Sequence, residues 1–300
     1  CYLGGQAVGS AQIDLLFGKV NPSGKLAETF PVKLEDNPSY LNFPGERNRA
    51  EYREGIFVGY RYYDTKKQDV LFPFGHGLSY TTFEYKNMTL SKTDIRDTDT
   101  ITVSVDVTNT GRCAGKETVQ LYIAAEGGSV IRPMKELKGF EKTYLKPGET
   151  KRVEFVLSKR SFAYWEERLS DWHAESGRYR ILIGKSSRDI VLEQSVQFQS
   201  DISIPAVYDM NTTLGEIVSN PKLCGFLKVM EELLGSDMPK LFFEEEQGGA
   251  AEREAITLEM RNATALDTPL RSIIGFGTGA VSYETLEELV VQLNRWSGGM

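Results

Sequence analysis

The chain has 300 residues, of which 40% are hydrophobic and 26% charged, and its mean hydropathy is -0.33. This composition is typical of a soluble globular protein, and the length suits about two domains of ~100–200 residues. No run of about 18 apolar residues occurs, so no membrane-spanning helix is predicted. The net charge of -7 is concentrated in residues 201–300, which hold 16 acidic and 7 basic side chains. This acidity argues against nucleic-acid binding, which requires basic surfaces.

The three cysteines, Cys1, Cys113 and Cys224, are scattered, and no Cys-x-x-Cys pair occurs. Three scattered cysteines do not predict a disulfide framework. Because the chain also has only two histidines, no zinc site is predicted. This cysteine usage is typical of a reducing compartment, so we expect a cytoplasmic protein. The chain opens on Cys1 and not on Met, and we expect the natural N-terminus to lie upstream.

Residues 1–30 predict a helix followed by a strand. Apolar residues recur at helical spacing up to Leu16, and Gly18 ends the helix. A buried strand over Leu26–Phe30 follows a turn. Residues 31–55 are polar and contain three prolines, which predicts a long loop of the kind that often carries function.

Residues 83–199 predict an antiparallel β-sandwich. Between Ile101 and Val107, apolar residues alternate with polar ones, which is the period of a half-buried strand. Short strands separated by Gly-, Pro- and Asn-containing turns are typical of sandwiches. Further strands are predicted over residues 118–124, 153–157, 179–183 and 190–198.

Residues 200–300 predict a small helical extension. Residues 211–213 can cap a short helix, and residues 221–235 place their apolar side chains on one helical face. An acidic, Gly- and Ala-rich stretch over residues 244–255 predicts a loop. Ser282 is positioned to cap a last helix.

The most informative stretch is LFPFGHGLSYTTF at residues 71–83. It closely resembles the junction motif of glycoside hydrolase family 3, where an α/β-sandwich domain meets a fibronectin type III-like domain. Three other segments resemble the same family in the same order. They are GGQA through GKVNPSGKL (residues 4–26), EGIFVGYRYYD (54–64) and VTNTG (107–111).

The resemblance implies a mixed fold with three parts. Residues 1–82 would be the C-terminal part of the α/β-sandwich domain, 83–199 the immunoglobulin-like fibronectin type III-like sandwich, and 200–300 the helical extension. It also implies the C-terminal part of a retaining β-glycosidase, above all a β-glucosidase, acting on oligosaccharides or other β-glycosides. Such enzymes need two carboxyl groups about 5–5.5 Å apart, and the resemblance implies neither metal nor organic cofactor.

In that family the nucleophile is an Asp on a barrel domain, and the usual acid/base is a Glu upstream of the GGQA-like segment. Neither motif maps onto this chain, so no catalytic residue is assigned. We therefore expect a scaffolding segment that is inactive alone. Its expected partners are the substrate and the missing barrel and sandwich half, with no nucleic acid or membrane; a homo-oligomer is left open.

Carboxylates flank a tyrosine-rich stretch around residue 60, which is a combination seen in sugar sites. Glu51, Glu54 and Asp64 are the carboxylates, and Tyr52, Glu54 and Tyr62 are candidates for a substrate-binding rim. The opposing interpretation is a surface loop with ordinary salt bridges, with tyrosines that pack in the core. This opposing interpretation is the favoured one.

His76 lies between Gly75 and Gly77 in the junction motif. A histidine there could act as a general acid or base. A position between two glycines in a packed junction favours a structural, hydrogen-bonded side chain instead.

Two rival functions remain open from the sequence. A non-catalytic glycan- or protein-binding module would show an exposed planar row of aromatic rings, for which Tyr164, Trp165 and Trp172 are candidates. A structural subunit that joins a separate barrel chain would show a large exposed apolar face. The fragment of a longer glycosidase predicts the same apolar face.

Overall fold

The computed structural model describes residues 2, 4–204, 206–220, 223, 266–272 and 282–297. The chain divides into two compact units, Cys1–Ile202 and Ser203–Met300. Apart from Leu223, the predicted helix over residues 221–235 and the predicted loop over 244–255 lie outside the described residues. Within the described ranges, no helix is long and apolar enough to cross a membrane.

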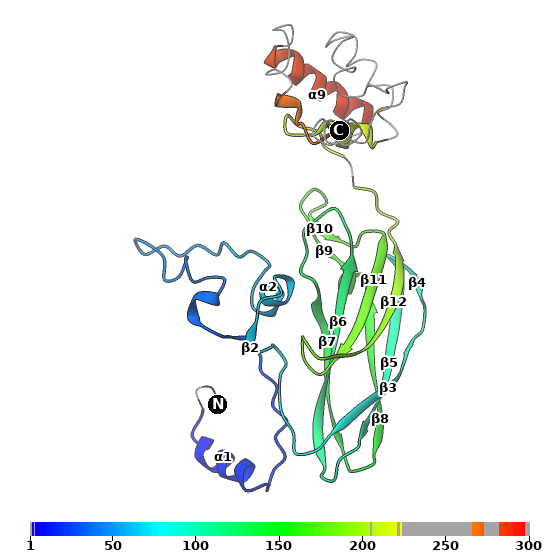
Figure 1. Cartoon of the computed structure of the whole chain (residues 1–300). Coiled ribbons are helices and arrows are strands. Elements are labelled where there is room, and N and C mark those ends of the chain that lie inside the picture. The colour runs from blue at the N-terminus through cyan, green and yellow to red at the C-terminus, as the bar shows by residue number, and fades with distance from the viewer. Residues whose placement is uncertain are drawn as a thin grey trace, which may run out of the picture. The chain divides into compact units, whose positions relative to one another are not determined.

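The first unit is dominated by a β-sandwich of two sheets (Figure 1). Neighbouring strands are antiparallel, except that β12 and β4 are parallel. The prediction of a mixed fold centred on an all-β sandwich is confirmed. The five-stranded sheet has the order β4 (Asp94–Arg96), β12 (Ile190–Gln199), β11 (Gly177–Gly184), β6 (Gly115–Glu126), β7 (Glu136–Leu145), and the three-stranded sheet has the order β3 (Phe83–Leu90), β5 (Thr100–Asn109), β8 (Thr150–Ser158).

The sandwich core follows from the alternation in the sequence. The apolar side chains of β5 from Ile101 to Val107 are buried, as are Leu121 of β6 and Ile181 of β11. Removing these side chains from water between the two sheets is the main stabilising contribution, about 1.5–3 kcal/mol for each large aliphatic side chain. The five predicted strands are all present, each somewhat longer than predicted.

Several elements of the sandwich were not predicted. Strand β7 carries polar side chains and is only partly buried, so apolar and polar residues do not alternate clearly along it. A short helix α3 (Lys159–Phe162) leads into a small hairpin of β9 (Tyr164–Glu166) and β10 (Asp171–His173). Strands of three residues are too short to leave a period in the sequence.

The N-terminal segment, residues 4–80, forms little regular structure. The predicted first helix is present as α1 (Val8–Leu16), and Gly18 follows it with φ +70°. The predicted strand over Leu26–Phe30 is wrong for most of its length, because only β1 (Phe30–Pro31) pairs, with β2 (Val70–Phe72).

Two short helices also lie in this segment. The 3-10 helix η1 (Leu34–Asp36) interrupts the predicted long loop. Helix α2 (Tyr60–Thr65) was not predicted and lies beside the sandwich (Figure 1).

The second unit has its own small core. The predicted caps are present: Thr213 forms a capping box with Glu216 at α4 (Leu214–Val218), and Ser282 Oγ accepts a hydrogen bond from Thr285 N at 3.1 Å at α9 (Tyr283–Ser297). With η3 (Leu270–Ser272), these helices bury a leucine-rich cluster. Its members include Leu214, Ile217, Leu223, Leu270, Leu286, Leu289 and Leu293.

Candidate functional site

The candidate site is built where α2 packs on the outer face of the five-stranded sheet. Tyr60 stacks on Phe74 with ring centroids 4.7 Å apart and meets Tyr122 of β6 edge-on at 5.9 Å. The Tyr60 hydroxyl accepts a hydrogen bond from Leu137 N at 2.7 Å. Burial raises the pKa of Tyr60 and of Tyr122, so both hydroxyls stay protonated. With Tyr63 also buried, Tyr60 and Tyr63 belong to the core, as favoured from the sequence, whereas this interpretation is wrong for Tyr52, which is 86% exposed.

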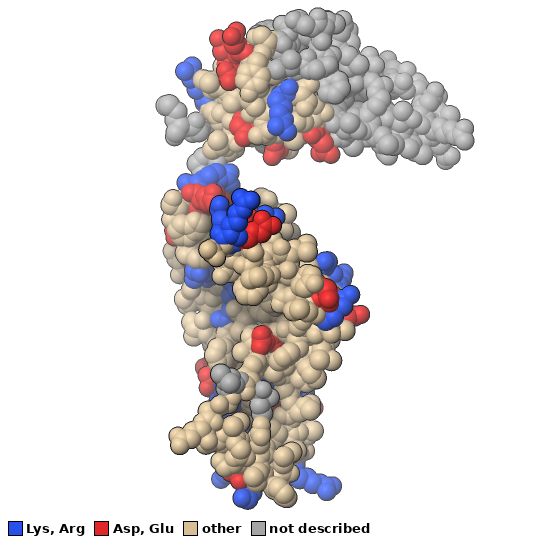
Figure 2. Space-filling model, turned by 90° about the vertical axis from the view of Figure 1, so that its left-hand side faces the viewer, with Lys and Arg blue, Asp and Glu red and all other residues tan. Residues whose placement is uncertain are grey.

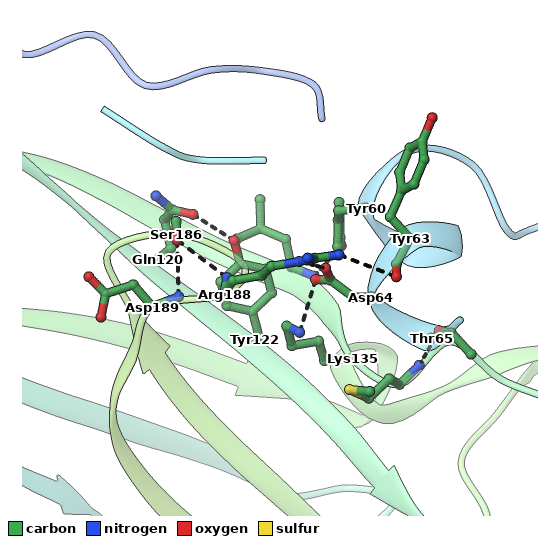
Figure 3. Close-up of polar contacts among 12 residues, drawn as sticks. Tyr60, Tyr63, Asp64, Thr65, Gln120, Tyr122, Lys135, Ser186, Arg188 and Asp189 are labelled. Atoms are coloured by element: carbon green, nitrogen blue, oxygen red, sulfur yellow. Dashed lines mark hydrogen bonds and ion pairs between the residues drawn. The ribbon is translucent and has the colours of Figure 1, made fainter. Parts of the chain in front are cut away.

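A buried ion network fastens α2 to the sandwich (Figure 3). Asp64 Oδ1 accepts a hydrogen bond from Arg188 Nε at 2.8 Å, and Asp64 Oδ2 lies 2.9 Å from Lys135 Nζ. The Arg188 guanidinium also donates to the backbone oxygens of Tyr63 at 3.3 Å and Gln68 at 2.6 Å. Three residues far apart in the chain therefore hold one end of α2 in a fixed position.

The burial of this network decides its role. The Asp64 side chain is 3% exposed and that of Lys135 is 8% exposed. The interpretation of Asp64 as a surface carboxylate with ordinary salt bridges is therefore wrong, since two cations neutralise it in the interior. Losing one partner of a buried pair typically costs about 3–5 kcal/mol, so Asp64 is a structural residue.

Gly75 of the junction motif is required because Gln120 lies close to its backbone. Gly75 has φ +79°, and a side chain there would overlap Gln120. Gln120 Nε2 donates to the backbone oxygens of Gly75 at 3.2 Å and Lys185 at 2.7 Å. The backbone of Leu26 pairs with the same motif through Gly75 N and His76 O, each at 2.8 Å. Glycine permits both the positive φ and the contact.

His76 has a structural position, but by a different interaction from the one expected. Its ring stacks on Phe72 with centroids 5.2 Å apart. Among the described residues, no hydrogen bond of its ring nitrogens is found, so the expected hydrogen bond stays a prediction. The imidazole is held by aromatic packing.

Two of the three rim candidates line one pocket of about 520 Å³. Glu54 Oε2 is buried in the fold without a hydrogen-bond partner among the described residues. Tyr62 accepts a hydrogen bond from Lys66 Nζ at 2.8 Å. Tyr52 is 86% exposed and does not line the pocket. The other lining residues are Pro38, Asn42, Arg53, Phe57, Thr65 and Lys66.

The remaining carboxylate of the tyrosine-rich stretch is paired at the surface. Glu51 lies 2.8 Å from Arg53 and 4.0 Å from Arg49, in agreement with the salt-bridge interpretation. In the described part of the chain, no group of three or more His, Cys, Asp or Glu side chains could hold a metal ion.

The N-terminal segment exposes much apolar surface. Helix α1 has no buried residue, and Leu16 and Phe17 are each 78% exposed. The sequence predicted such a face at the place where further protein would pack. Figure 2 faces this side of the first unit, where few charged side chains interrupt the surface of its lower part. Other exposed apolar side chains of the segment include Ile13, Leu34, Leu41 and Leu78.

Comparisons with known proteins account for both parts of the first unit. The "Glycosyl hydrolase family 3 C-terminal domain" matches residues 1–80, and the "Fibronectin type III-like domain" matches residues 117–187. The chain belongs to glycoside hydrolase family 3. It is 51% identical over 300 residues to the thermostable beta-glucosidase B of Acetivibrio thermocellus, covering 98% of this chain but 37% of that protein. The chain thus spans little more than a third of this relative.

Other family 3 proteins resemble a shorter part of the chain. The exo-alpha-(1->6)-L-arabinopyranosidase of Bifidobacterium breve is 47% identical over 73% of this chain and 28% of that protein. The crystal structure of the Bifidobacterium adolescentis GH3 beta-glucosidase superposes with a TM-score of 0.66 and 45% identity, over 74% of this chain and 32% of that one. Relatives that are named for different activities therefore share this family 3 segment.

The aromatic side chains proposed for a rival binding module do not form a planar row. The rings of Trp165 and Trp172 are inclined at 75° with centroids 5.6 Å apart, and the Arg160 guanidinium covers Trp172 at 3.1 Å from the centroid. Tyr164 meets His173 edge-on at 5.9 Å. The family 3 relationship and this geometry disfavour a binding module as the chain's main role.

Sequence reasoning missed the buried network altogether. Asp64 was identified as a candidate carboxylate, but Lys135 and Arg188 carried no signal of their own. A buried carboxylate requires cationic partners. The requirement could be stated from the sequence, but the partners could not be named.

Proposed function

We propose that this chain is the C-terminal part of a retaining β-glycosidase of the β-glucosidase type, which hydrolyses terminal β-linked sugars. Its role is to complete and brace the domain that carries the acid/base. One observation carries the proposal. A family 3 segment is fastened to its fibronectin type III-like sandwich by a buried network, while its other side exposes apolar surface. A face of this kind is typical of an interface with further protein.

We place both catalytic carboxyls outside this segment. A retaining glycosidase needs one ionised nucleophile and one protonated acid about 5–5.5 Å apart. Asp64 is buried between two cations and Glu51 is paired with Arg53, so neither is available to attack an anomeric carbon. The chain's contribution is then to position groups that the rest of the protein supplies.

A direct contribution to substrate binding is proposed for the rim. Glu54 lines the pocket, where its carboxylate can accept a hydrogen bond from a sugar hydroxyl, and the Tyr62 ring offers a neighbouring aromatic face. In the intact enzyme, Glu54→Gln is expected to raise KM by about tenfold with little change in kcat, as for a lost charge-assisted hydrogen bond. An unchanged KM would remove Glu54 from the binding surface.

The sugar itself is set elsewhere. Relatives with nearly equal identity to this chain are named a β-glucosidase and an arabinopyranosidase. We infer that the parts of the protein outside this segment choose the sugar. A cytoplasmic location stays a prediction from the sequence, a place in carbohydrate metabolism is proposed together with the activity, and a homo-oligomer stays open.

The experiment is a domain exchange. The part of Acetivibrio thermocellus beta-glucosidase B that matches this chain is replaced by the 300 residues, and the chimaera is assayed on a panel of aryl β-glycosides. The wild-type relative is the positive control. Hydrolysis of aryl β-glucosides is expected. A folded chimaera that hydrolyses none of the panel would contradict the scaffolding role.

A further inference from the structure

A second pocket, of about 670 Å³, opens on the sandwich. Its walls are the β6–β7 connection from Val130 to Pro133, the start of β7, and the segment from α3 to β10. Ile56 and Arg61 of the N-terminal segment complete it. The volume lies within the ~300–1,000 Å³ that small-molecule sites occupy.

Basic side chains outnumber acidic ones in the lining of this pocket, which we call the cationic pocket. Glu136 is shared by Arg61 at 3.6 Å, Arg132 at 3.3 Å and Lys138 at 3.3 Å. Arg160 has no ion-pair partner within the described part of the chain. The lining holds five cations, Arg61, Arg132, Lys138, Arg160 and Arg168, and three carboxylates, Glu136, Glu166 and Glu167.

Only one of the cations is fully matched. Arg168 pairs with Glu166 through Nε at 2.7 Å and Nη2 at 3.1 Å, so this pair is self-contained. Glu167 is exposed to solvent, where water screens its charge. The cations around Glu136 therefore share one carboxylate, and their positive charge is only partly neutralised at the pocket.

The burial of these cations strengthens the field in the pocket. The side chains of Arg132 and Lys138 are 10% and 13% exposed. Burial lowers the pKa of Lys138, Arg132 and Arg160 lower it further, and Glu136 opposes them. A second anion among these groups would be attracted strongly, because low-dielectric walls focus the field of a cleft.

An aromatic wall stands beside the charges. Trp165 is 50% exposed and meets Trp172 edge-on, while the guanidinium carbon of Arg160 lies over the Trp172 ring, 3.1 Å from its centroid. A pyranose ring has apolar C–H faces that pack on an exposed indole. A planar guanidinium that is already oriented by stacking is suited to bind a carboxylate through two hydrogen bonds.

We propose that the cationic pocket binds an acidic sugar, a glycoside or oligosaccharide that carries a uronic-acid carboxylate. The carboxylate lies among Arg132, Lys138 and Arg160, and the sugar ring packs on Trp165. This inference rests on the proposed function, because it takes the ligand class to be carbohydrate. The site gives the enzyme a means to hold charged glycans.

The test is calorimetric titration of the 300-residue chain with methyl β-glucuronide, methyl β-glucoside and acetate. The glucoside has the same ring without the carboxylate, and acetate has the carboxylate without the ring. We expect the glucuronide to bind at least about tenfold more tightly than either, because it alone makes both interactions. Absence of glucuronide binding, or equal binding of either control ligand, would overturn the proposal.

Three variants locate the site. Arg160→Gln and Lys138→Gln are each expected to weaken glucuronide binding by about tenfold, and Trp165→Ala is expected to weaken it as well. Arg152→Gln removes the same charge from a residue that does not line the pocket. The affinity of this variant for the glucuronide should stay within about twofold of that of the unmodified chain, since distant surface charges are screened. Circular dichroism confirms that each variant is folded. An Arg160→Gln variant that binds as Arg152→Gln does would overturn the assignment.

Failure of this inference and failure of the proposed function are distinguishable. An active chimaera that does not bind the glucuronide overturns the pocket and leaves the glycosidase role intact. Binding without any hydrolysis by the chimaera overturns the glycosidase role. If the 300 residues bind the glucuronide but the folded chimaera does not, the rest of the protein covers the pocket and the inference fails for the intact enzyme.

Discussion

Replacing Asp64 by Asn should strongly destabilise the first unit. The substitution preserves shape but leaves Lys135, whose side chain is 8% exposed, without its anion at 2.9 Å. The cost of leaving Arg188 without the carboxylate is smaller, because its side chain is 31% exposed and keeps its two backbone partners. We therefore expect the low end of the range for breaking a buried pair, about 3 kcal/mol.

The assay is urea denaturation of the 300-residue chain at neutral pH, followed by the circular dichroism of its β-sheets. The matched control is Asp106→Asn, because Asp106 also forms an ion pair with an arginine, Arg152 at 2.8 Å, but the Arg152 side chain is 54% exposed. Surface pairs contribute little, so the control should lose far less stability.

A double variant tests the cause. In Asp64→Asn with Lys135→Met, no unpaired ammonium remains in the interior, so the double variant should be more stable than Asp64→Asn alone. Equal losses for Asp64→Asn and Asp106→Asn, or no recovery in the double variant, would refute the reasoning that burial makes this network important.

Three further predictions follow from particular contacts. Gly75→Ala should lower the free energy of unfolding by about 2 kcal/mol, because the added methyl group overlaps Gln120 and φ is +79°. Gly127→Ala, at φ +90° in open space, should lower it by about 1 kcal/mol, and equal losses in urea denaturation would contradict the close approach at Gly75. The Arg168 guanidinium lowers the pKa of Glu166 from 4.5 to about 2. The stability that this pair provides is therefore present at neutral pH and lost as pH falls from about 4.5 to about 2, and Glu166→Gln should flatten the urea stability profile in that window. Leu16→Asp, at a side chain 78% exposed, should change the stability of the chain by less than about 0.5 kcal/mol yet abolish the activity of the chimaera; full activity would show that α1 contacts nothing further.

The sequence predicted those elements whose burial is periodic. The alternation from Ile101 to Val107 produced a strand at the right place, and the caps Thr213 and Ser282 marked two helices correctly. Helix α2 was missed because it is one short element of six residues, entered through Gly59 at φ +55° and stabilised by packing on Phe74 and Tyr122. The predicted domain boundaries stay predictions.

The candidate site was less accessible from the sequence than the fold. Tyr52, Glu54 and Tyr62 were named together as rim candidates, and the structure places Glu54 and Tyr62 at one pocket, whereas Tyr52 does not line it. The partners of Asp64 are 71 and 124 residues away along the chain. Local periodicity carries no information on pairs at such separations, so only the folded arrangement reveals them.

The most direct test of the central claim is steady-state hydrolysis of an aryl β-glucoside by the 300-residue chain alone, at high protein concentration. The chain is expected to be folded and to give no turnover above the uncatalysed rate, because we propose that the catalytic carboxylates lie outside this segment. Clear turnover by the purified chain would contradict the scaffolding role, and Glu54 would then be the first carboxylate to replace.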